Sequence, residues 1–225
     1  EWWKAGGGGT VWDGILYDPQ TDSVVFGTGN GIPWPANLRS PGGGDNLFLA
    51  SIVAVDASTG RYVWHYQNSP GDTWDYPAAM DMVLADLQID GRLRKVLLQA
   101  PKNGFFYVLD RTNGSVLLAK PFLRRVDWAS GIGADGRPVV IDPHGCPTDA
   151  ANWSSTAFSP VTGLYYFLAL EECVGKPTGY PDQTGQRFLR AVNIETGEIA
   201  WEVAQPGSAR AKTWSGVMGT AGGLL

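Results

Sequence analysis

The stretch AVDASTGRYVW, residues 54–64, decides the fold because it recurs along the chain. It returns as AVNIETGEIAW at residues 191–201 and, more weakly, as VLDRTNGSVLL at residues 108–118. In each copy a strand-like run reaches an acidic or amide residue, a glycine closes a turn, and a second apolar run follows. Such self-similarity predicts β-units that bury a face against their neighbours, and the Trp of two copies supplies a broad stacking surface. The repeat therefore predicts part of a β-propeller.

Composition agrees with an all-β chain and narrows the possible partners. The 225 residues include 30 Gly, 15 Pro and 10 Trp, which suits many turns and aromatic-filled sheets better than helices. A net charge of −5 argues against nucleic acid, whose binding needs basic patches. No apolar run reaches the roughly 18 residues of a membrane-spanning helix.

Turn signals predict five strand–turn–strand units, and we expect the 225 residues to hold roughly three to four blades of about four strands each. The five candidate hairpins lie around residues 18–22, 54–64, 108–118, 157–167 and 191–201. Irregular segments are predicted at residues 29–46, 68–77 and 124–153, and long loops of this kind are usually functional. Residues 80–87 fit a short helix or a strand. Because the chain lacks an initiator Met and stops at an apparent strand entrance, we expect residues 1–225 to be an incomplete propeller domain without its N- and C-terminal blades.

Four further motifs make the chain resemble a known family. They are GTGNGIPW at residues 27–34, GDNLFL at 44–49, WDY at 74–76 and PKNGFFYVLDR at 101–111. Their order and spacing are similar to those of the methanol- and ethanol-type alcohol dehydrogenases that depend on pyrroloquinoline quinone (PQQ). The resemblance covers nearly the whole chain. It implies an eight-bladed propeller with tryptophan-docking repeats and the oxidation of a primary alcohol to the aldehyde by hydride transfer to calcium-bound PQQ.

The resemblance also implies a catalytic base and a metal site. Alcohol oxidation requires a base for the hydroxyl proton and a Lewis acid for the quinone carbonyl. Asp75 matches the base and also a metal ligand, and Asn30 matches a calcium-ligand asparagine whose amide oxygen suits a hard cation. A glutamate from an earlier blade would complete the metal site. Pro77 stands where lanthanide-using relatives carry an extra aspartate, so calcium is favoured over a lanthanide. Without the resemblance, Asn30 and Asp75 could each be turn residues, and Asp72 is the turn candidate beside Asp75.

Five residues match positions that contact PQQ in the family. Trp12 matches the tryptophan beneath the quinone ring, and Thr10 matches a hydroxyl that bonds a PQQ carboxylate. Lys102 matches the cation beside the quinone oxygens, where an ammonium stabilises negative charge on the reduced ring. Asn152 and Trp214 match two further cofactor contacts. Taken alone, either tryptophan also fits a core or docking position, and Lys102 fits a solvated turn.

Cys146 and Cys173 are the only cysteines, and neither the CxxC nor the CxxCH spacing is present. The resemblance implies that they form a structural disulfide around the Asn152 segment, which requires an oxidising space such as the periplasm. Two free buried thiols are the alternative. The implied electron acceptor is a cytochrome c or an attached haem domain, and the implied substrate is a small alcohol.

Two other functions remain open. A cofactor-free propeller of PQQ-type repeats could act as a protein-interaction scaffold, but it would have no reason to keep Trp12, Asn30, Asp75 and Lys102 together. A sugar dehydrogenase of the same superfamily is disfavoured because the segments at residues 44–49 and 101–106 are similar to the alcohol type. We expect residues 1–225 alone to be inactive, since an open propeller exposes strand edges and docking faces.

Overall fold

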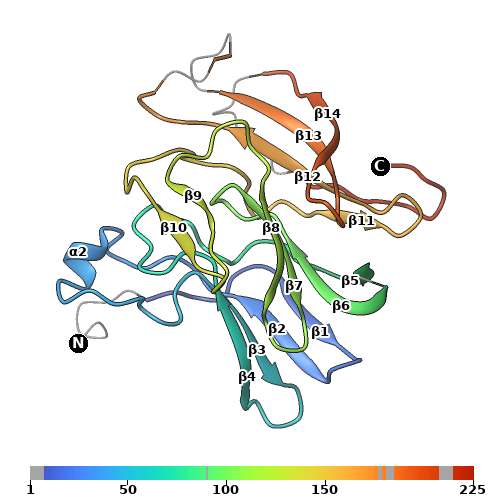
Figure 1. Cartoon of the computed structure of the whole chain (residues 1–225), viewed down its shortest axis with the longest axis horizontal. Helices are drawn as coiled ribbons and strands as arrows, with labels where there is room; N and C mark the ends of the chain where they lie inside the picture. The colour runs from blue at the N-terminus through green and yellow to red at the C-terminus, as the bar shows by residue number, and fades with distance from the viewer. Residues whose placement is uncertain (1–7, 90, 177–178, 181–184, 208–214) are drawn as a thin grey trace.

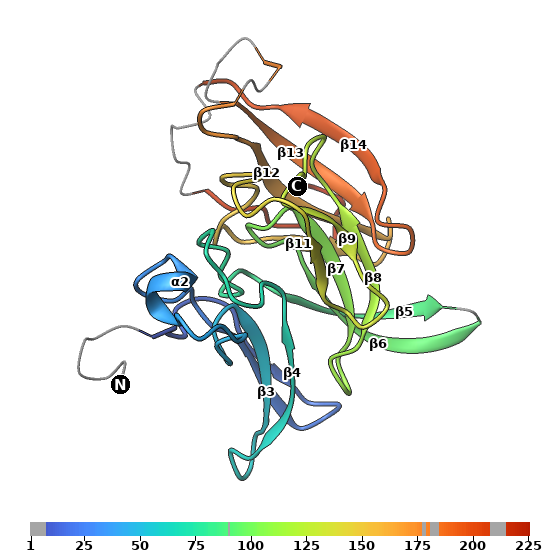
Figure 2. The same cartoon turned by 60° about the vertical axis from the view of Figure 1, so that its left-hand side comes forward.

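The computed structural model describes residues 8–89, 91–176, 179–180, 185–207 and 215–225. Its strands form three four-stranded sheets, each with its strands adjacent in sequence order, and one two-stranded hairpin. The three sheets lie side by side like blades, with the N-terminal sheet at one end of the row and the C-terminal sheet at the other (Figures 1 and 2). This arrangement confirms the predicted all-β fold and a partial propeller of at least three blades.

The first sheet consists of β1 (Ile15–Asp18), β2 (Ser23–Gly27), β3 (Ser51–Asp56) and β4 (Tyr62–Gln67). The second consists of β5 (Val83–Ile89), β6 (Arg92–Gln99), β7 (Phe105–Asp110) and β8 (Val116–Pro121). The third consists of β11 (Ala157–Ser159), β12 (Leu164–Glu171), β13 (Gln186–Asn193) and β14 (Ile199–Ala204). The hairpin is formed by β9 (Ala129–Ile132) and β10 (Pro138–Val140), and one short helix, α2 (Ala36–Arg39), lies between β2 and β3. Within the described residues, no helix has the length and apolar character needed to cross a membrane.

The three copies of the repeat fold into the same turn between the last two strands of each sheet. In each copy the glycine N–H donates to the carbonyl of the acidic or amide residue four positions earlier, at 2.8 Å. The pairs are Gly60 with Asp56, Gly114 with Asp110, and Gly197 with Asn193. The three glycines have φ of +69°, +75° and +73°, a left-handed conformation that favours glycine. The glycine stands at the same offset in each copy of the repeat because all three copies form the same turn.

Trp64 docks the first sheet onto the second, as the repeat predicts. Its side chain is 4% exposed, and its Nε1 donates to the Arg111 carbonyl oxygen at 3.0 Å. The ring lies on Gly114, where an added Cβ would come within 2.6 Å of Trp64 Cε3. In the second sheet Leu118 stands at the Trp position, and Gly197 of the third sheet packs close to it. A large apolar residue on a glycine turn therefore joins each sheet to the next.

The second sheet is buried on both faces. Leu97 and Tyr107 belong to the hydrophobic cluster shared with the first sheet. Leu98 and Phe106, their neighbours in sequence, belong to the cluster shared with the third sheet. Because successive side chains of a strand point to opposite faces, one strand pair supplies both interfaces. This packing fixes the ends of the sheets, from which the connecting loops emerge.

In three segments the structure differs from the secondary structure predicted from the sequence or settles a point that the sequence left open. Residues 124–153, predicted to be irregular, contain the hairpin β9–β10, whose short strands and register shift leave little alternation to recognise. Residues 80–87, left open between helix and strand, enter strand β5. The loop at residues 29–46 contains the single turn of helix α2.

Candidate active site at the loop end of the sheets

The described candidate residues all lie in connections at the same end of the sheets. Asn30 follows β2, Asp75 lies between β4 and β5, Lys102 joins β6 to β7, and Asn152 precedes β11. Because antiparallel strands follow one another in sequence order, these connections leave the sheets at one end, while the glycine turns of the repeats lie at the other. Separate loops thus bring the polar and charged side chains of the candidate residues to a common region.

Asp75 and Lys102 meet in this region. Lys102 Nζ lies 2.6 Å from Asp75 Oδ2, with the two side chains 13% and 20% exposed. Asp75 has a φ of +68°, which is uncommon for a residue with a side chain and is often found at functional sites. The residue matched to the base and the residue matched to the cation therefore form one ion pair.

Asp72 fixes the backbone around Asp75. Its Oδ1 accepts hydrogen bonds from the N–H groups of Trp74 at 3.2 Å and of Tyr76 at 3.1 Å. Asp72 is only 2% exposed, and this burial raises its pKa to about 6. Asp72 is thus the turn residue that the sequence indicates, and it brackets Asp75 from both sides.

Aromatic rings flank the Asp75 segment. The rings of Trp74 and Tyr76 stack with 5.6 Å between centroids and 7° between planes. Trp128 packs against both, with its centroid 4.8 Å from that of Trp74 and 5.4 Å from that of Tyr76. The segment carrying Asp75 is therefore backed by a rigid apolar cluster. Trp128 belongs to no motif, so the sequence offers no signal for its place here.

Asp149 is a second carboxylate at the site that sequence reasoning missed. It accepts a hydrogen bond from Asn152 Nδ2 at 3.4 Å, and its buried Oδ1 has no hydrogen-bond partner among the described residues. Burial raises the pKa of Asp149 to about 6, and the neighbouring positive charge of Lys102 opposes that rise.

The segment before Asn30 packs against the segment of Thr10 and Trp12. The Gly29 N–H donates to the Thr10 carbonyl at 2.9 Å. A Cβ on Gly29 would lie 3.1 Å from Trp12 Nε1, so the backbone approaches the indole closely. Trp12 remains 45% exposed and offers an aromatic surface beside Asn30. The Asn30 amide nitrogen donates to the Gly31 carbonyl at 3.4 Å, so the amide oxygen is the candidate ligand atom.

One backbone hydrogen bond connects the two halves of the site. The N–H of Ala78, three residues after Asp75, donates to the Thr28 carbonyl, two residues before Asn30, at 3.0 Å. The described hydrogen bonds do not join Asn30 to Asp75 directly. Among the described residues, His, Cys, Asp and Glu side chains nowhere gather in a group of three or more around a metal-sized space. Asn30 and Asp75 would therefore form only part of a ligand set.

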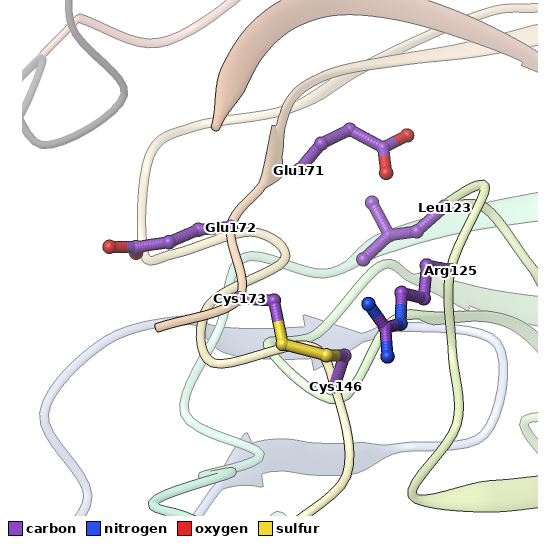
Figure 3. A pocket seen from close by; sticks show the side chains of 6 residues that line it. All are labelled: Leu123, Arg125, Cys146, Glu171, Glu172 and Cys173. Carbon is purple, nitrogen blue, oxygen red and sulfur yellow. A yellow bond between two sulfur atoms is a disulfide. The ribbon is translucent and has the colours of Figure 1, made fainter. Parts of the chain in front are cut away.

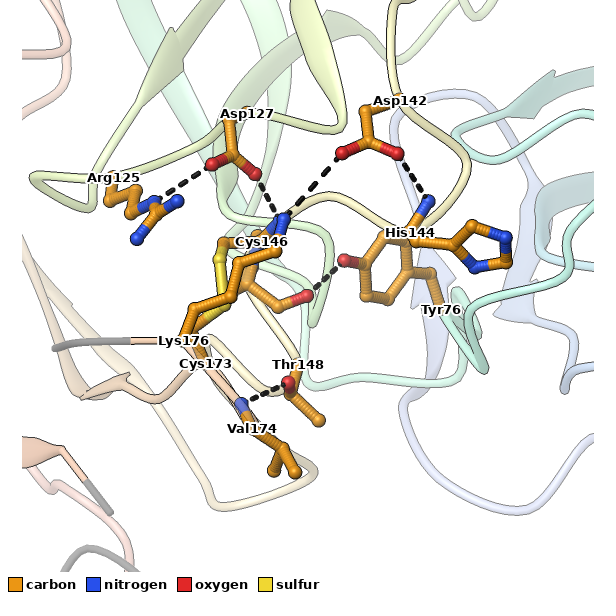
Figure 4. Close-up of a disulfide and its surroundings, with 11 residues drawn as sticks. Tyr76, Arg125, Asp127, Asp142, His144, Cys146, Thr148, Cys173, Val174 and Lys176 are labelled. Atoms are coloured by element: carbon orange, nitrogen blue, oxygen red, sulfur yellow. Dashed lines mark hydrogen bonds and ion pairs between the residues drawn. A yellow bond between two sulfur atoms is a disulfide. The ribbon is translucent and has the colours of Figure 1, made fainter. Parts of the chain in front are cut away.

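The predicted disulfide is present beside the site. Cys146 and Cys173 are bonded, with their Cα atoms 5.5 Å apart. The hydroxyl of Tyr76 donates to the carbonyl of Pro147, so the disulfide loop is tied to the aromatic cluster (Figure 4). A small pocket next to the disulfide is lined by Leu123, Arg125, Cys146, Glu171, Glu172 and Cys173 (Figure 3). Trp214 lies outside the described residues.

The donor set matches the requirements of the predicted ligands. Amide and carboxylate oxygens, as in Asn30 and Asp75, are the ligands that calcium prefers. A flat quinone carrying carboxylates needs an aromatic surface, a cation and polar hydrogen-bonding groups. Trp12, Lys102 and Asn152 are of these types.

Comparisons with known proteins agree with the predicted family and with the propeller fold. The family profile described as "PQQ: Glucose/ethanol/alcohol dehydrogenase, beta-propeller domain" matches residues 1–119. The quinohemoprotein alcohol dehydrogenase of Comamonas testosteroni is 52% identical over 179 residues, which cover 75% of this chain and 25% of that protein. A crystal structure of the quinohemoprotein alcohol dehydrogenase from that organism superposes with a TM-score of 0.80 and 41% identity, covering 92% of this chain and 36% of the other.

A europium-containing methanol dehydrogenase superposes with a TM-score of 0.77 and 32% identity, covering 91% of this chain and 41% of the other. The chain thus spans between 25% and 41% of the length of the proteins it resembles.

Proposed function

Since the chain belongs to the β-propeller family of PQQ-dependent glucose, ethanol and alcohol dehydrogenases, we propose that the protein containing it oxidises a primary alcohol, such as ethanol or methanol, to the aldehyde. The observation that supports this most directly is the contact of 2.6 Å between Asp75 and Lys102 at the loop end of the sheets. Removal of a hydroxyl proton requires a base, and a cation offsets the negative charge of the reduced quinone. Residues of both types in one region therefore support this reaction.

Each residue has a distinct task in this proposal. Asp75 would accept the hydroxyl proton of the alcohol, helped by a backbone that Asp72 holds in place. Lys102 would face the quinone oxygens and offset the negative charge that develops there. Asn30 and Asp75 would supply two of the oxygen ligands of Ca²⁺. When bound, PQQ supplies the hydride acceptor, and the cation polarises its reactive carbonyl.

The remaining predicted contacts would hold the cofactor. Trp12 would lie beneath the ring, because its indole is exposed beside Asn30. Thr10 and Asn152 would hydrogen-bond polar atoms of PQQ, and Trp214 stays a prediction from the sequence. Placing an aromatic floor and fixed donors around a flat cofactor restricts its orientation before the alcohol binds.

Calcium is the metal that we propose for this chain. One similar structure is a europium-containing methanol dehydrogenase, so a lanthanide occurs in at least one relative. Lanthanide users carry an additional aspartate two positions after the base, where this chain has Pro77. A proline side chain offers no oxygen, so the site would lack the extra negative charge that favours a trivalent ion.

The electron acceptor and the compartment follow from the same reasoning. We propose a haem as acceptor, carried by a separate cytochrome c or by an attached domain, because the similar dehydrogenase is named a quinohemoprotein. We propose the periplasm as compartment, because the Cys146–Cys173 disulfide requires oxidising conditions.

The test is reconstitution of the complete gene product with PQQ and Ca²⁺, followed by dye-linked oxidation of ethanol and, for comparison, glucose. We expect ethanol oxidation that needs both additions and that falls by about 10²–10⁴ in Asp75→Asn, the range of general-base catalysis. Asp135→Asn, at an exposed turn, is the matched control and should keep full activity. Activity on glucose alone would favour the sugar dehydrogenase. A folded, calcium-loaded protein that binds no PQQ would contradict the proposal and leave the cofactor-free scaffold.

A further inference from the structure

Arg39, the last residue of helix α2, makes four hydrogen bonds that join two loops of the site. Its Nη1 donates to the carbonyl oxygens of Pro33 at 2.7 Å and Trp34 at 2.8 Å, and its Nε donates to Asn46 Oδ1 at 3.0 Å. Its Nη2 donates to the Asp72 carbonyl at 2.6 Å. The first three acceptors lie in the loop between β2 and β3, and the fourth lies in the segment that carries Asp75.

The space and the acceptors around Arg39 suit a guanidinium group. Gly31 lies directly beneath it, because a Cβ on Gly31 would come within 2.7 Å of both Cζ and Nε of Arg39. The fork of fixed N–H groups can reach acceptors on both sides in one plane, whereas the ammonium of a lysine is a point charge without that geometry. The same Cβ would also come within 2.6 Å of Leu49 Cδ1, so Gly31 leaves room for both side chains. The chemistry proposed for the site does not explain the four hydrogen bonds of Arg39.

We call the Arg39 guanidinium with its four acceptors the clamp. On one side the clamp reaches Asp72, three residues before the proposed base. The Asp72 carbonyl accepts from the guanidinium, and the Asp72 carboxylate accepts from the N–H groups of Trp74 and Tyr76. Asp75 lies between these two amides in a left-handed conformation. Holding the Asp72 backbone therefore holds the frame that sets the direction of the Asp75 side chain.

On the other side the clamp holds the residues that follow the proposed metal ligand. Pro33 and Trp34 stand three and four positions after Asn30. A second, weaker link runs in parallel, because the Ala36 N–H donates to Thr73 Oγ1 at 3.4 Å. Backbone hydrogen bonds from Ala78 to Thr28 and from Gly71 to Asp45 also join the two segments. Arg39 adds the link that runs from residues 33–34 to the Asp72 carbonyl.

We propose that Arg39 is a positioning residue that sets the spacing between Asn30 and Asp75 and so aligns the base with the metal site. The inference rests on the proposed function for its catalytic consequence, whereas the clamp itself can be measured without any cofactor. Sequence reasoning missed Arg39 because it lies in none of the motifs and its four partners are spread over residues 33–72.

The first measurement is hydrogen–deuterium exchange of the complete gene product without PQQ or Ca²⁺. In Arg39→Lys we expect the amides of residues 72–76 to exchange about tenfold faster, the effect of losing a charge-assisted hydrogen bond. Arg94→Lys is the matched control, because Arg94 is half-buried and pairs with Asp110 in the second sheet, away from the site. Unchanged exchange at residues 72–76 would overturn the clamp.

The second measurement is steady-state ethanol oxidation with PQQ and Ca²⁺, expressed per molecule of bound PQQ. A misplaced base lowers kcat, so we expect kcat to fall about tenfold in Arg39→Lys with a smaller change in KM. Gly31→Ala should act in the same direction, because its Cβ would displace the guanidinium together with the side chain of Leu49. A purely structural role would reduce the amount of bound PQQ but leave kcat per PQQ unchanged, and that result would overturn the positioning role.

The two measurements separate the two proposals. If the wild-type protein oxidises no alcohol, the proposed function fails, and the exchange experiment still decides whether Arg39 holds residues 72–76. If the wild type is active and both variants match it in kcat per PQQ, the positioning role fails and the proposed function stands.

Discussion

Asp72 and Asp75 are two carboxylates three positions apart that meet different surroundings. Asp75 pairs with Lys102, whereas Asp72 is buried and accepts two backbone N–H groups. Their environments differ although their residue type is the same: Asp72 fixes a turn, and Asp75 is the residue that we propose as the base. This difference leads to a prediction that concerns stability and needs no cofactor.

Asp72 should make the stability of the protein fall between about pH 4 and pH 6. Burial raises the pKa of Asp72 from its ordinary 3.8 to about 6, so the folded protein favours the neutral carboxyl. A group with a raised pKa contributes its stability fully below its unfolded pKa and loses that contribution as the pH rises through the folded pKa. Asp72→Asn keeps the acceptor oxygen and removes the titration. Relative to the wild type, the unfolding free energy of Asp72→Asn should therefore be higher at pH 7 than at pH 4, by on the order of 1–3 kcal/mol.

This prediction is checked by unfolding the complete gene product without PQQ or Ca²⁺ across that pH range. Asp135→Asn, at an exposed turn, should show the same change of unfolding free energy with pH as the wild type. If Asp72→Asn also shows the wild-type change with pH, Asp72 is not the group responsible.

At the scale of the elements, the glycine of each repeat turn can have two roles: it adopts a left-handed conformation, and it leaves room for a packed side chain. A comparison of Gly60 with Gly114 distinguishes the two roles. Gly60 and Gly114 have similar φ values of +69° and +75°. A Cβ on Gly60 would meet nothing within 4 Å, whereas a Cβ on Gly114 would lie 2.6 Å from Trp64 Cε3. We expect Gly60→Ala to cost about 1 kcal/mol of unfolding free energy and Gly114→Ala about 2–4 kcal/mol. Denaturant unfolding of both variants measures the difference, and equal losses would contradict a docking role for Trp64.

The repeat turns could be predicted from the sequence because each is a local structure in which residues four apart form the hydrogen bond. The docking of Trp64 could be predicted from its fixed offset in the repeat. In contrast, hairpin β9–β10 could not be predicted, because its strands have only four and three residues and are shifted in register. Short strands carry too little alternation to distinguish them from a loop.

The same physical limit applies to the site. Asp75 and Lys102 could be nominated because each lies in a motif, but their contact spans 27 residues and no local pattern encodes it. Asp149, Trp128 and Arg39 acquire their surroundings only when separate connections converge. Residues whose task depends on tertiary neighbours are therefore the ones that sequence reasoning misses.

At the scale of the whole molecule, the site depends on how the sheets are held together. Asn30 comes from a connection within the first sheet, Lys102 from one within the second, and Asn152 precedes the third. Two hydrophobic clusters set the spacing of these sheets, and the Cys146–Cys173 disulfide adds a covalent link between the Asn152 segment and the end of β12. Loss of any one of these links should therefore change the relative positions of the site residues.

The disulfide offers the clearest test of this dependence. Its loop spans 27 residues, for which the chain-entropy estimate of its stabilisation is about 3–4 kcal/mol. Replacing both cysteines, as Cys146→Ser with Cys173→Ser, avoids leaving a reactive thiol and should lower the unfolding free energy by about that amount. Because the Tyr76 hydroxyl donates to the Pro147 carbonyl, we also expect weaker PQQ binding in the double variant. Dithiothreitol should lower the stability of the wild type toward that of the double variant and leave the double variant unchanged. A wild type whose stability and PQQ affinity do not respond to the reductant would contradict a structural role for this link.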